Sequence, residues 1–266
     1  MGDTYTHGHH ESVLRSHRWR TAENSAAYLL PHLDSGMNML DVGCGPGTIT
    51  LDLASRIAPG TIIGIDNSPE VIALAEQERT QALADNVGYA VGDVYALDFD
   101  DGRFDVVHAH QVLQHLTDPV AALTEMRRVL TPDGLLAVRE TDYGARAIAP
   151  DDSRLDRWND LYHEVCARNS AEPNAGRYLL HWVRRAGFSE ATLSSSTWTF
   201  ADAETRAWWG ATWADRCLQS SFAEQAVAYG LSDQQELIDL ADAWREWSVQ
   251  PDGCIFNVHG EVLARP

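Results

Sequence analysis

The chain contains no lysine: all 20 of its basic residues are arginine, against 39 acidic residues. The absence of lysine excludes mechanisms that use a lysine Schiff base. The formal net charge is −19 at pH 7. Because nucleic-acid binding depends on basic surface that displaces counterions, this charge argues against a DNA- or RNA-binding function. Lysine depletion with abundant alanine, aspartate and arginine also indicates a GC-rich bacterial genome.

Paired cysteines and long apolar runs are absent as well. The four cysteines form no C-x-x-C pair, which predicts free thiols and neither a zinc site nor a disulfide framework. No apolar run reaches transmembrane length, and the first residues show no basic-then-apolar leader. We therefore expect a cytoplasmic protein without a membrane partner. A chain of 266 residues can form one large α/β domain with an elaboration.

The most informative segment begins at Asp41, the last polar residue of an apolar strand. Gly43, Gly45 and Gly47 follow at every second position before a helix begins. Glycine has no Cβ atom, so the chain can turn sharply and a ligand can lie on backbone N–H groups. Thr48 stands where the dinucleotide fingerprint has its third glycine, so the spacing departs from the usual NAD or FAD pattern. The segment predicts a site for another nucleotide-type cofactor.

Further strand candidates follow in the order of a doubly wound sheet. The first ends at Asp66, about 20 residues beyond the loop, where such folds place an acid that binds the ribose hydroxyls. The second leads to Asp93, whose carboxylate can accept a hydrogen bond from an adenine amino group. The candidates are residues 61–65, 87–91, 104–110 and, after a helix end and a turn within 129–138, a fifth strand.

In these motifs the chain resembles the class I S-adenosylmethionine-dependent methyltransferases, especially the small-molecule branch similar to ubiquinone-biosynthesis enzymes. The resemblance is strong over residues 36–140. It implies a doubly wound, Rossmann-like α/β fold with a seven-stranded sheet whose last strand is antiparallel, and S-adenosyl-L-methionine (SAM) as cofactor. The cofactor-binding residues that it implies are Asp41, Gly43 and Gly45 for the methionine part, Asp66 for the ribose and Asp93 with Val94 for the adenine, together with Asn67, His110, His115 and Tyr5.

The resemblance also divides the chain into a core and additions. A helical stretch from Glu23 to Leu33 belongs to a segment that folds over the cofactor as a lid in this family. The insertions project from the carboxyl edge of the sheet, where such folds bind ligands, and are expected to form a mainly helical substrate cap. The expected divisions are an N-terminal lid and helix at 1–35, a SAM-binding core at 36–200 with a cap insertion near 143–176, a helical cap at 201–253, and a final core strand at 254–266.

The expected cap has a high density of aromatic residues. Packing of the insertion helices onto the domain explains such density in general. Trp209 and Trp213 lie one helical turn apart and are the pair expected to face a pocket. Such a pocket would favour a flat or apolar substrate. From the lid, His7 is expected to reach the substrate; the neighbouring histidines do not indicate a metal, since adjacent histidines seldom converge on one ion.

Four ionisable residues follow the fourth and fifth strands and are candidate catalytic residues: His110, Glu140, Asp142 and Tyr143. Methyl transfer from a sulfonium requires positioning of the acceptor and, where the acceptor is protonated, removal of its proton. Alternation places Glu140 and Asp142 on one face of an extended segment and Tyr143 on the other. A carboxylate shielded from water there would have a raised pKa and could accept a proton. No single residue stands out as the base.

These features predict a methyltransferase that acts on a small, aromatic or otherwise apolar metabolite, by O-, N- or C-methylation, in specialised-metabolite biosynthesis. Two alternatives stay open. One is a methyltransferase of protein or peptide side chains, which an open groove would favour. The other is a SAM-binding protein that transfers no methyl group. The expected partner is the methyl acceptor, with no nucleic acid, membrane or metal, and the oligomeric state is left open.

Overall fold

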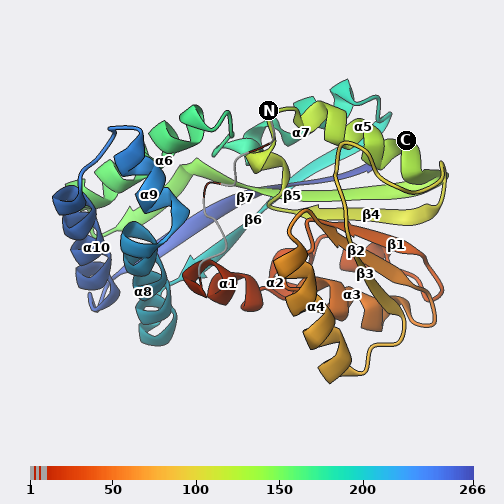
Figure 1. Cartoon of the computed structure of the whole chain (residues 1–266), viewed down its shortest axis with the longest axis horizontal. Coiled ribbons are helices and arrows are strands. Elements are labelled where there is room, and N and C mark those ends of the chain that lie inside the picture. Colours follow the sequence, from red (N-terminus) through yellow and green to blue (C-terminus); the bar gives the residue numbers. More distant parts are fainter. Residues whose placement is uncertain (1–2, 4–5, 7–10) are drawn as a thin grey trace.

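The computed structural model describes residues 3, 6 and 11–266, apart from the side chains of residues 11–14. Its centre is a seven-stranded sheet with the strand order β3-β2-β1-β4-β5-β7-β6 (Figure 1). Strand β7 is antiparallel to both of its neighbours, and the other pairs are parallel. This confirms the predicted fold class. The strands are β1 (Met39–Val42), β2 (Ile62–Asp66), β3 (Val87–Val91), β4 (Phe104–His110), β5 (Leu130–Ala149), β6 (Glu190–Phe200) and β7 (Cys254–Arg265).

Helices cover both faces of this sheet. Two of them, α3 and α4, lie on one face, and α5 and α7 lie on the other (Figure 1). Each face has its own apolar core between sheet and helices. The helices are α1 (Glu11–Arg18), α2 (Ala22–Ser25), α3 (Thr48–Ile57), α4 (Pro69–Ala82), α5 (Pro119–Val129), α6 (Ser153–Arg168), α7 (Ala175–Arg185), α8 (Ala203–Gln219), α9 (Ser221–Ala228) and α10 (Gln234–Ser248), with 3₁₀ turns η1 (Leu30–His32) and η2 (Leu113–His115).

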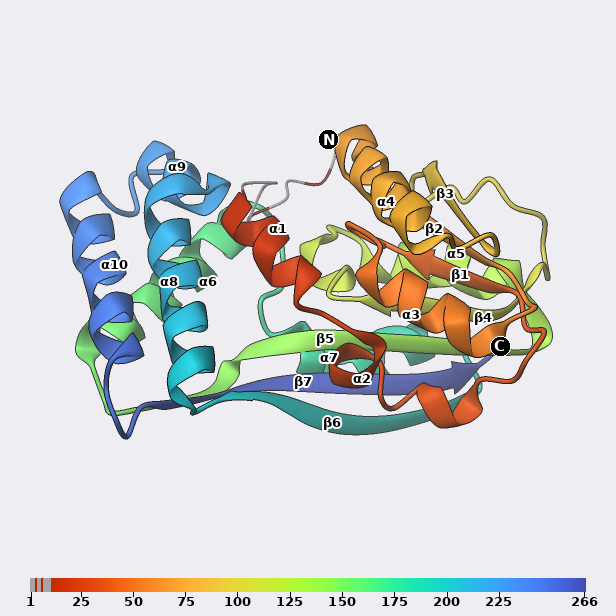
Figure 2. The same cartoon turned by 90° about the horizontal axis from the view of Figure 1, so that it is seen from below.

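A third apolar core lies beyond the short strands. Strands β5, β6 and β7 extend past the rest of the sheet, and α6, α8, α9 and α10 gather at their far end (Figure 2). Trp158, Trp213 and Trp244 are fully buried there, and their ring centroids lie 4.4 to 6.0 Å apart. We call these four helices the cap. Much of its aromatic content packs the helices against one another.

The N-terminal part differs from the sequence prediction. The predicted continuous helix from Glu23 to Leu33 is wrong, because α2 ends at Ser25 and the chain resumes only as the short turn η1. A continuous helix would place Pro31 in its interior, where proline lacks an N–H donor and clashes with the preceding turn; in the structure Pro31 lies in the first turn of η1 instead. The two lid residues Tyr5 and His7 lie outside the described residues.

Strand β5 is longer than the sequence predicts. It continues to Ala149, so Arg139, Glu140 and Asp142 lie within the sheet and pair with β7. Asp142 pairs with Val258 and Ala147 with Phe256, so five steps along β5 correspond to two along β7. Such irregularities bend a strand and redirect its side chains.

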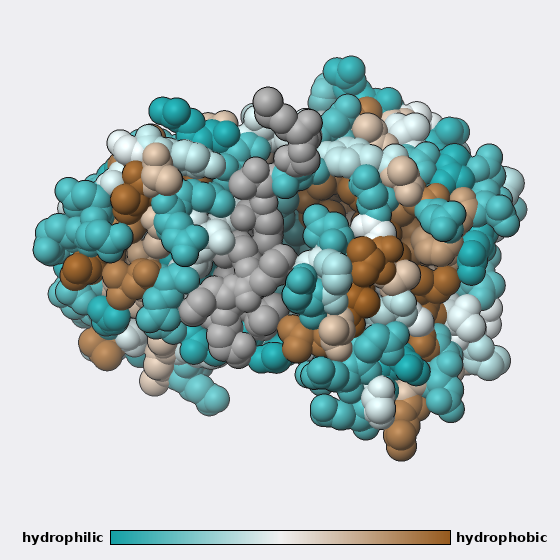
Figure 3. Space-filling view, viewed as in Figure 1, coloured by the Kyte–Doolittle hydropathy of each residue, from teal (hydrophilic) through white to brown (hydrophobic). Residues whose placement is uncertain are grey.

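The face of the molecule seen in Figure 3 is mainly hydrophilic. Hydrophilic residues predominate there, and hydrophobic residues lie among them. Within the residues that the structure describes, no helix combines the length and apolar character that crossing a membrane requires.

Candidate functional site

The glycine loop turns between β1 and α3 as its sequence predicts. Gly43, Gly45 and Gly47 have φ values of +66°, +56° and +86°, a region in which other residues are strained. A Cβ atom on Gly43 or Gly47 would collide with neighbouring side chains. At Gly45 it would meet only the ring of His17, at 3.7 Å. The backbone at Gly45 is therefore open to a ligand.

A large cavity runs from this loop, past the carboxyl ends of the parallel strands, to the cap. It encloses about 1650 Å³, its open mouth included. Ligands of doubly wound folds bind at this edge of the sheet. The predicted cofactor residues that line it are Asp41, Gly43, Gly45, Asp66, Asn67, Asp93, Val94, His110 and His115. Toward the cap it is lined by Trp19, Arg20, Tyr143, Arg146, Trp198, Trp209, Arg216, Asn257 and His259.

We call the part of the cavity beside the glycine loop its loop end and the part beside the cap its cap end. Two acids at the loop end also hold the backbone around the cavity in place. The carboxylate of Asp66 accepts hydrogen bonds from the backbone N–H groups of Gly45 and Ser68, at 3.2 and 3.1 Å, so it braces the loop beside the cavity. The buried carboxylate of Asp41 lies 2.7 Å from Nδ1 of His108 and accepts a hydrogen bond from Thr50 at 2.5 Å. Asp41 thus ties β1 to β4 and α3 while it lines the cavity.

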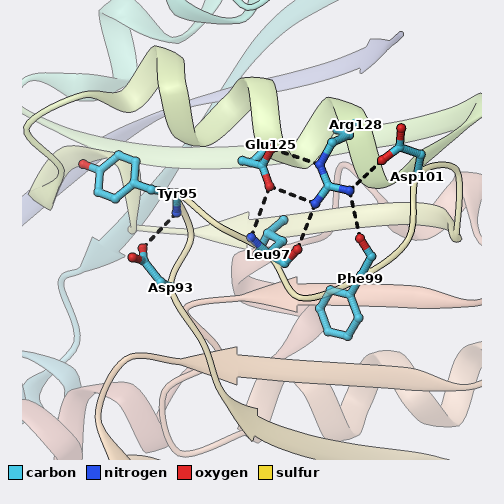
Figure 4. Close-up of polar contacts among 7 residues, drawn as sticks. All are labelled: Asp93, Tyr95, Leu97, Phe99, Asp101, Glu125 and Arg128. Carbon is cyan, nitrogen blue, oxygen red and sulfur yellow. Dashed lines mark hydrogen bonds and ion pairs between the residues drawn. The ribbon is translucent and has the colours of Figure 1, made fainter.

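The loop that carries Asp93 is anchored to helix α5 (Figure 4). Arg128 donates hydrogen bonds of 2.8 Å to the carbonyl oxygens of Leu97 and Phe99. The carboxylate of Asp93 accepts a hydrogen bond from the backbone N–H of Tyr95 at 2.9 Å. The acid predicted to lie at the adenine therefore stands on a fixed loop.

Histidines line the cavity where the loop end meets the cap end. His110 ends β4, and His259 lies on β7; the ring of Trp198 is 5.7 Å from the first and 4.4 Å from the second. Burial, and then the positive charge of Arg20, lower the pKa of His110 well below its usual value. Burial likewise lowers the pKa of His115 to about 3. These imidazoles are neutral at physiological pH, and among the described residues neither ring nitrogen of His110 has a hydrogen-bond partner.

Two predicted catalytic carboxylates lie away from the cavity. Glu140 is fully buried and accepts hydrogen bonds from the backbone N–H groups of Val112 and Leu113, at 2.8 and 2.7 Å. Asp142 pairs with Arg177 of α7 at 2.5 Å. Their expected position at the mouth of the site is wrong, because β5 continues as a paired strand and its pleat turns both side chains from the cavity.

The aromatic candidates divide in the same way. Tyr143 lines the cavity, and burial raises the pKa of its phenol, which therefore stays protonated. Trp209 also lines the cavity, and its ring stacks on Phe200 at 4.5 Å. Trp213 does not line it: its ring is fully buried 4.4 Å from Trp158 in the cap core. Its expected place in the pocket is therefore wrong, since the cap has its own interior to fill.

Sequence reasoning missed much of the cap end of the cavity. Asn257 and His259, two positions apart on β7, are buried polar residues that line it. Polar residues at every second position of a strand covered on both sides are a signal that could have identified this face. No comparable signal exists for Arg146, because its direction depends on the irregularity in β5.

The cavity thus has two chemically different ends. The loop end offers bare backbone with Asp66 and Asp93, which suits a nucleoside and an amino-acid chain. The cap end offers aromatic rings and guanidinium groups. In the described part of the chain, no group of three or more His, Cys, Asp or Glu side chains could hold a metal ion.

Comparison with known proteins agrees with this geometry. The chain matches the methyltransferase domain family over residues 33–190. It is 35% identical to an uncharacterised methyltransferase of Schizosaccharomyces pombe, over 97% of this chain and 95% of that protein. It is 30% identical to the probable methyltransferase ltbC of Aspergillus luteorubrus, over 98% of this chain and 97% of that protein.

A solved structure shares the fold. The [4+2]-cyclase SpnF superimposes with a TM-score of 0.56 and 24% identity, over 100% of this chain and 89% of that one. The sheet order and the glycine loop define the class I methyltransferase architecture. The chain belongs to the methyltransferase domain family: it is a SAM-dependent methyltransferase, and SAM is its cofactor.

Proposed function

We propose that this enzyme methylates a small molecule with a flat, largely apolar body, in the cytoplasm and in a specialised-metabolite pathway. The observation that carries the proposal is the continuity of the cavity from the glycine loop to Trp198 and Trp209. A molecule that lies against these rings would face the cofactor end directly. Apolar walls with a few polar groups are the usual construction of small-molecule sites.

In this proposal the cofactor binds at the loop end of the cavity. The methionine part lies on Gly43 and Gly45 near Asp41, the ribose hydroxyls bind Asp66 beside Asn67, and the adenine lies at Asp93 and Val94. His110 and His115 then border the sulfonium. SAM supplies an electrophilic methyl group, and the chain positions the acceptor in line with it. Tyr5 and His7 remain predicted lid residues, with Tyr5 over the cofactor and His7 at the substrate.

Of the four predicted catalytic residues, two line the cavity. Glu140 and Asp142 do not line it, which leaves His110 and Tyr143. A phenol held protonated and an imidazole that resists protonation favour hydrogen bonding over base catalysis. We propose that the acceptor atom is already nucleophilic or becomes so with little help. Positioning then supplies most of the rate.

The test combines turnover with binding. The purified protein is incubated with SAM and a metabolite extract, and mass spectrometry follows S-adenosylhomocysteine (SAH) and any component that gains one methyl group. We expect both to appear together. Methylation confined to protein or peptide fractions would favour the side-chain methyltransferase. SAM binding with no methylated component would favour the non-methylating alternative.

A control variant checks the cofactor site in the same assay. Gly45→Ala adds a methyl group where the structure leaves room, at a left-handed position that costs about 1 kcal/mol. The domain should fold, and SAM affinity should fall because the added group lies under the ligand. SAM affinity equal to that of the wild type would remove the loop from the binding site.

A further inference from the structure

The cap end of the cavity carries a guanidinium without a carboxylate partner. Arg146 lies within the irregularity in β5 between Asp142 and Ala147, and it lines the same cavity as Tyr143 although the two are three positions apart. Its Nε donates a hydrogen bond to Oδ1 of Asn257 at 2.9 Å, and its Nη1 donates to Oδ1 of Asn159 at 3.3 Å. Among the described residues it forms no ion pair, in a chain whose net charge is −19. Its charge is therefore left for another group.

This guanidinium is held in place before any ligand arrives. It lies 4.4 Å from the ring centroid of Tyr143 and 4.4 Å from that of Trp158. Cation–π contacts of this kind fix the plane of an arginine. Burial lowers the pKa of Arg146 to about 10, so the side chain stays charged at neutral pH.

Asn257 adds an unused donor beside it. A guanidinium can only donate hydrogen bonds, so Asn257 must turn its oxygen toward Arg146 and its NH₂ group away. That Nδ2 atom is buried, has no hydrogen-bond partner among the described residues, and belongs to a side chain that lines the cavity. A buried amide donor without an acceptor costs free energy, which an incoming oxygen atom would recover.

A second arginine makes this end of the cavity more positive. Arg216 of α8 lines it, donates a hydrogen bond to Oγ of Ser16 at 2.5 Å and lies 4.9 Å from the ring of Trp213. The positive charges of Arg146 and Arg216 both oppose the rise in the pKa of Tyr143 that burial causes, and both side chains line the cavity that this phenol lines. An anion bound there would be desolvated among donors and aromatic rings.

We propose that the methyl acceptor carries a planar anionic oxygen group, such as a carboxylate, which binds Arg146 and Asn257 and directs the rest of the molecule toward the glycine loop. This inference rests on the proposed function, because it assumes that the acceptor occupies the cap end. A planar anion can accept hydrogen bonds from the N–H groups that Arg146 does not give to Asn257 and Asn159, while the aromatic rings beside it accommodate a flat body. The anionic group orients the acceptor, and another atom of the molecule receives the methyl group.

Two probes of equal shape test this charge preference. Calorimetry measures the binding of 2-naphthoate and of its neutral counterpart 2-naphthamide to the SAH-bound protein. We expect the carboxylate to bind at least about tenfold more tightly, as charge-assisted hydrogen bonds imply. Equal affinity for the two probes, or no detectable binding of either, would overturn the proposal.

Two variants locate the preference. Asn257→Asp keeps the side-chain shape but places a carboxylate beside Arg146, so the anion preference should vanish while the naphthamide affinity stays within about threefold. Arg146→Gln should have the same effect through loss of the charge. The matched controls change the same charges at exposed positions away from the cavity: Gln234→Glu adds one negative charge and Arg184→Gln removes one positive charge.

The two control variants should prefer the carboxylate probe as strongly as the wild type does. Every variant should bind SAH with the wild-type affinity. A preference for the carboxylate that survives in Asn257→Asp and Arg146→Gln would also overturn the proposal. SAH binding, measured on the same samples, separates the two hypotheses. A wild-type protein that binds SAH but does not prefer the carboxylate probe would defeat only this inference. A wild-type protein that does not bind SAH would defeat the proposed function.

Discussion

At the scale of single residues, Glu140 shows how a predicted catalytic group can serve the site indirectly. Its carboxylate accepts the backbone N–H groups at the start of η2, the turn that brings His115 to the cavity. Burial raises its pKa to about 8, even though these N–H groups oppose the shift. The sequence analysis expected a raised pKa for a carboxylate shielded from water at the mouth of the site; Glu140 has a raised pKa, but its side chain does not line the cavity.

This pKa predicts a stability that falls as the pH rises. An unfolded glutamate loses its proton near pH 4.3. Folded Glu140 keeps its proton until about pH 8, so folding is favoured most at low pH and this contribution is lost between about pH 4 and pH 8. Urea unfolding of wild type and Glu140→Gln across this range measures it. The wild type should lose stability relative to the variant, which cannot titrate; parallel curves would show that Glu140 is already ionised in the folded state.

His110 is the predicted catalytic residue at the cavity whose removal tests base catalysis most directly. Because its pKa is lowered well below the usual value, it is a weak base, and we expect His110→Ala to lower kcat by less than about tenfold. Tyr143→Phe, which removes only a hydroxyl, is the comparison. Turnover is measured with the acceptor found in the extract, alongside SAM affinity. A loss of about 100-fold in kcat with normal SAM affinity would identify His110 as the base instead.

At the scale of elements, the sequence predicts best where the signal is local. The predicted bounds of β3 and β4 match the structure, because an apolar run between turn residues decides a buried strand. The cap-side length of β5 depends on pairing with β7, more than 100 residues away in sequence, which no local pattern contains. The position of Arg146 at the cavity could not be predicted for the same reason, because the direction of its side chain follows from the register change between β5 and β7. The glycine loop could be predicted because its own residues determine its shape.

Helix α8 offers a matched pair of substitutions within one element. Trp209 lines the cavity and Trp213 fills the cap core, although they lie on successive turns. We expect Trp209→Leu to raise the KM of the acceptor while the KM of SAM stays unchanged. Trp213→Leu should instead lower the free energy of unfolding by about 2 to 4 kcal/mol through lost packing. Steady-state kinetics and denaturant unfolding of both variants check this division, and an equal rise in acceptor KM for both would contradict it.

At the scale of the whole molecule, α1 connects the sheet to the cap. Figure 2 shows it between α8 and the helices that cover the sheet. On the cap side Arg15 pairs with Asp215 at 2.9 Å. On the core side the backbone oxygen of His17 accepts a hydrogen bond from Thr48, the residue that begins α3 after the glycine loop, at 3.2 Å. His17 also lines the cavity, so this connection passes beside the site itself.

The position of α1 makes its order sensitive to the cofactor. A ligand bound at the glycine loop would contact His17, which lines the cavity, and would add interactions that the free protein lacks. A lid closed over the ligand in this way keeps water from the sulfonium. Hydrogen exchange should therefore show slower exchange in residues 11–18 when SAH is bound, with β7 unchanged as the internal reference. Removing residues 1–20 should raise the dissociation constant of SAM about tenfold or more and leave the sheet folded. Equal exchange with and without SAH, together with unchanged SAM affinity in the truncated protein, would reduce α1 to a structural connection between the cap and the sheet.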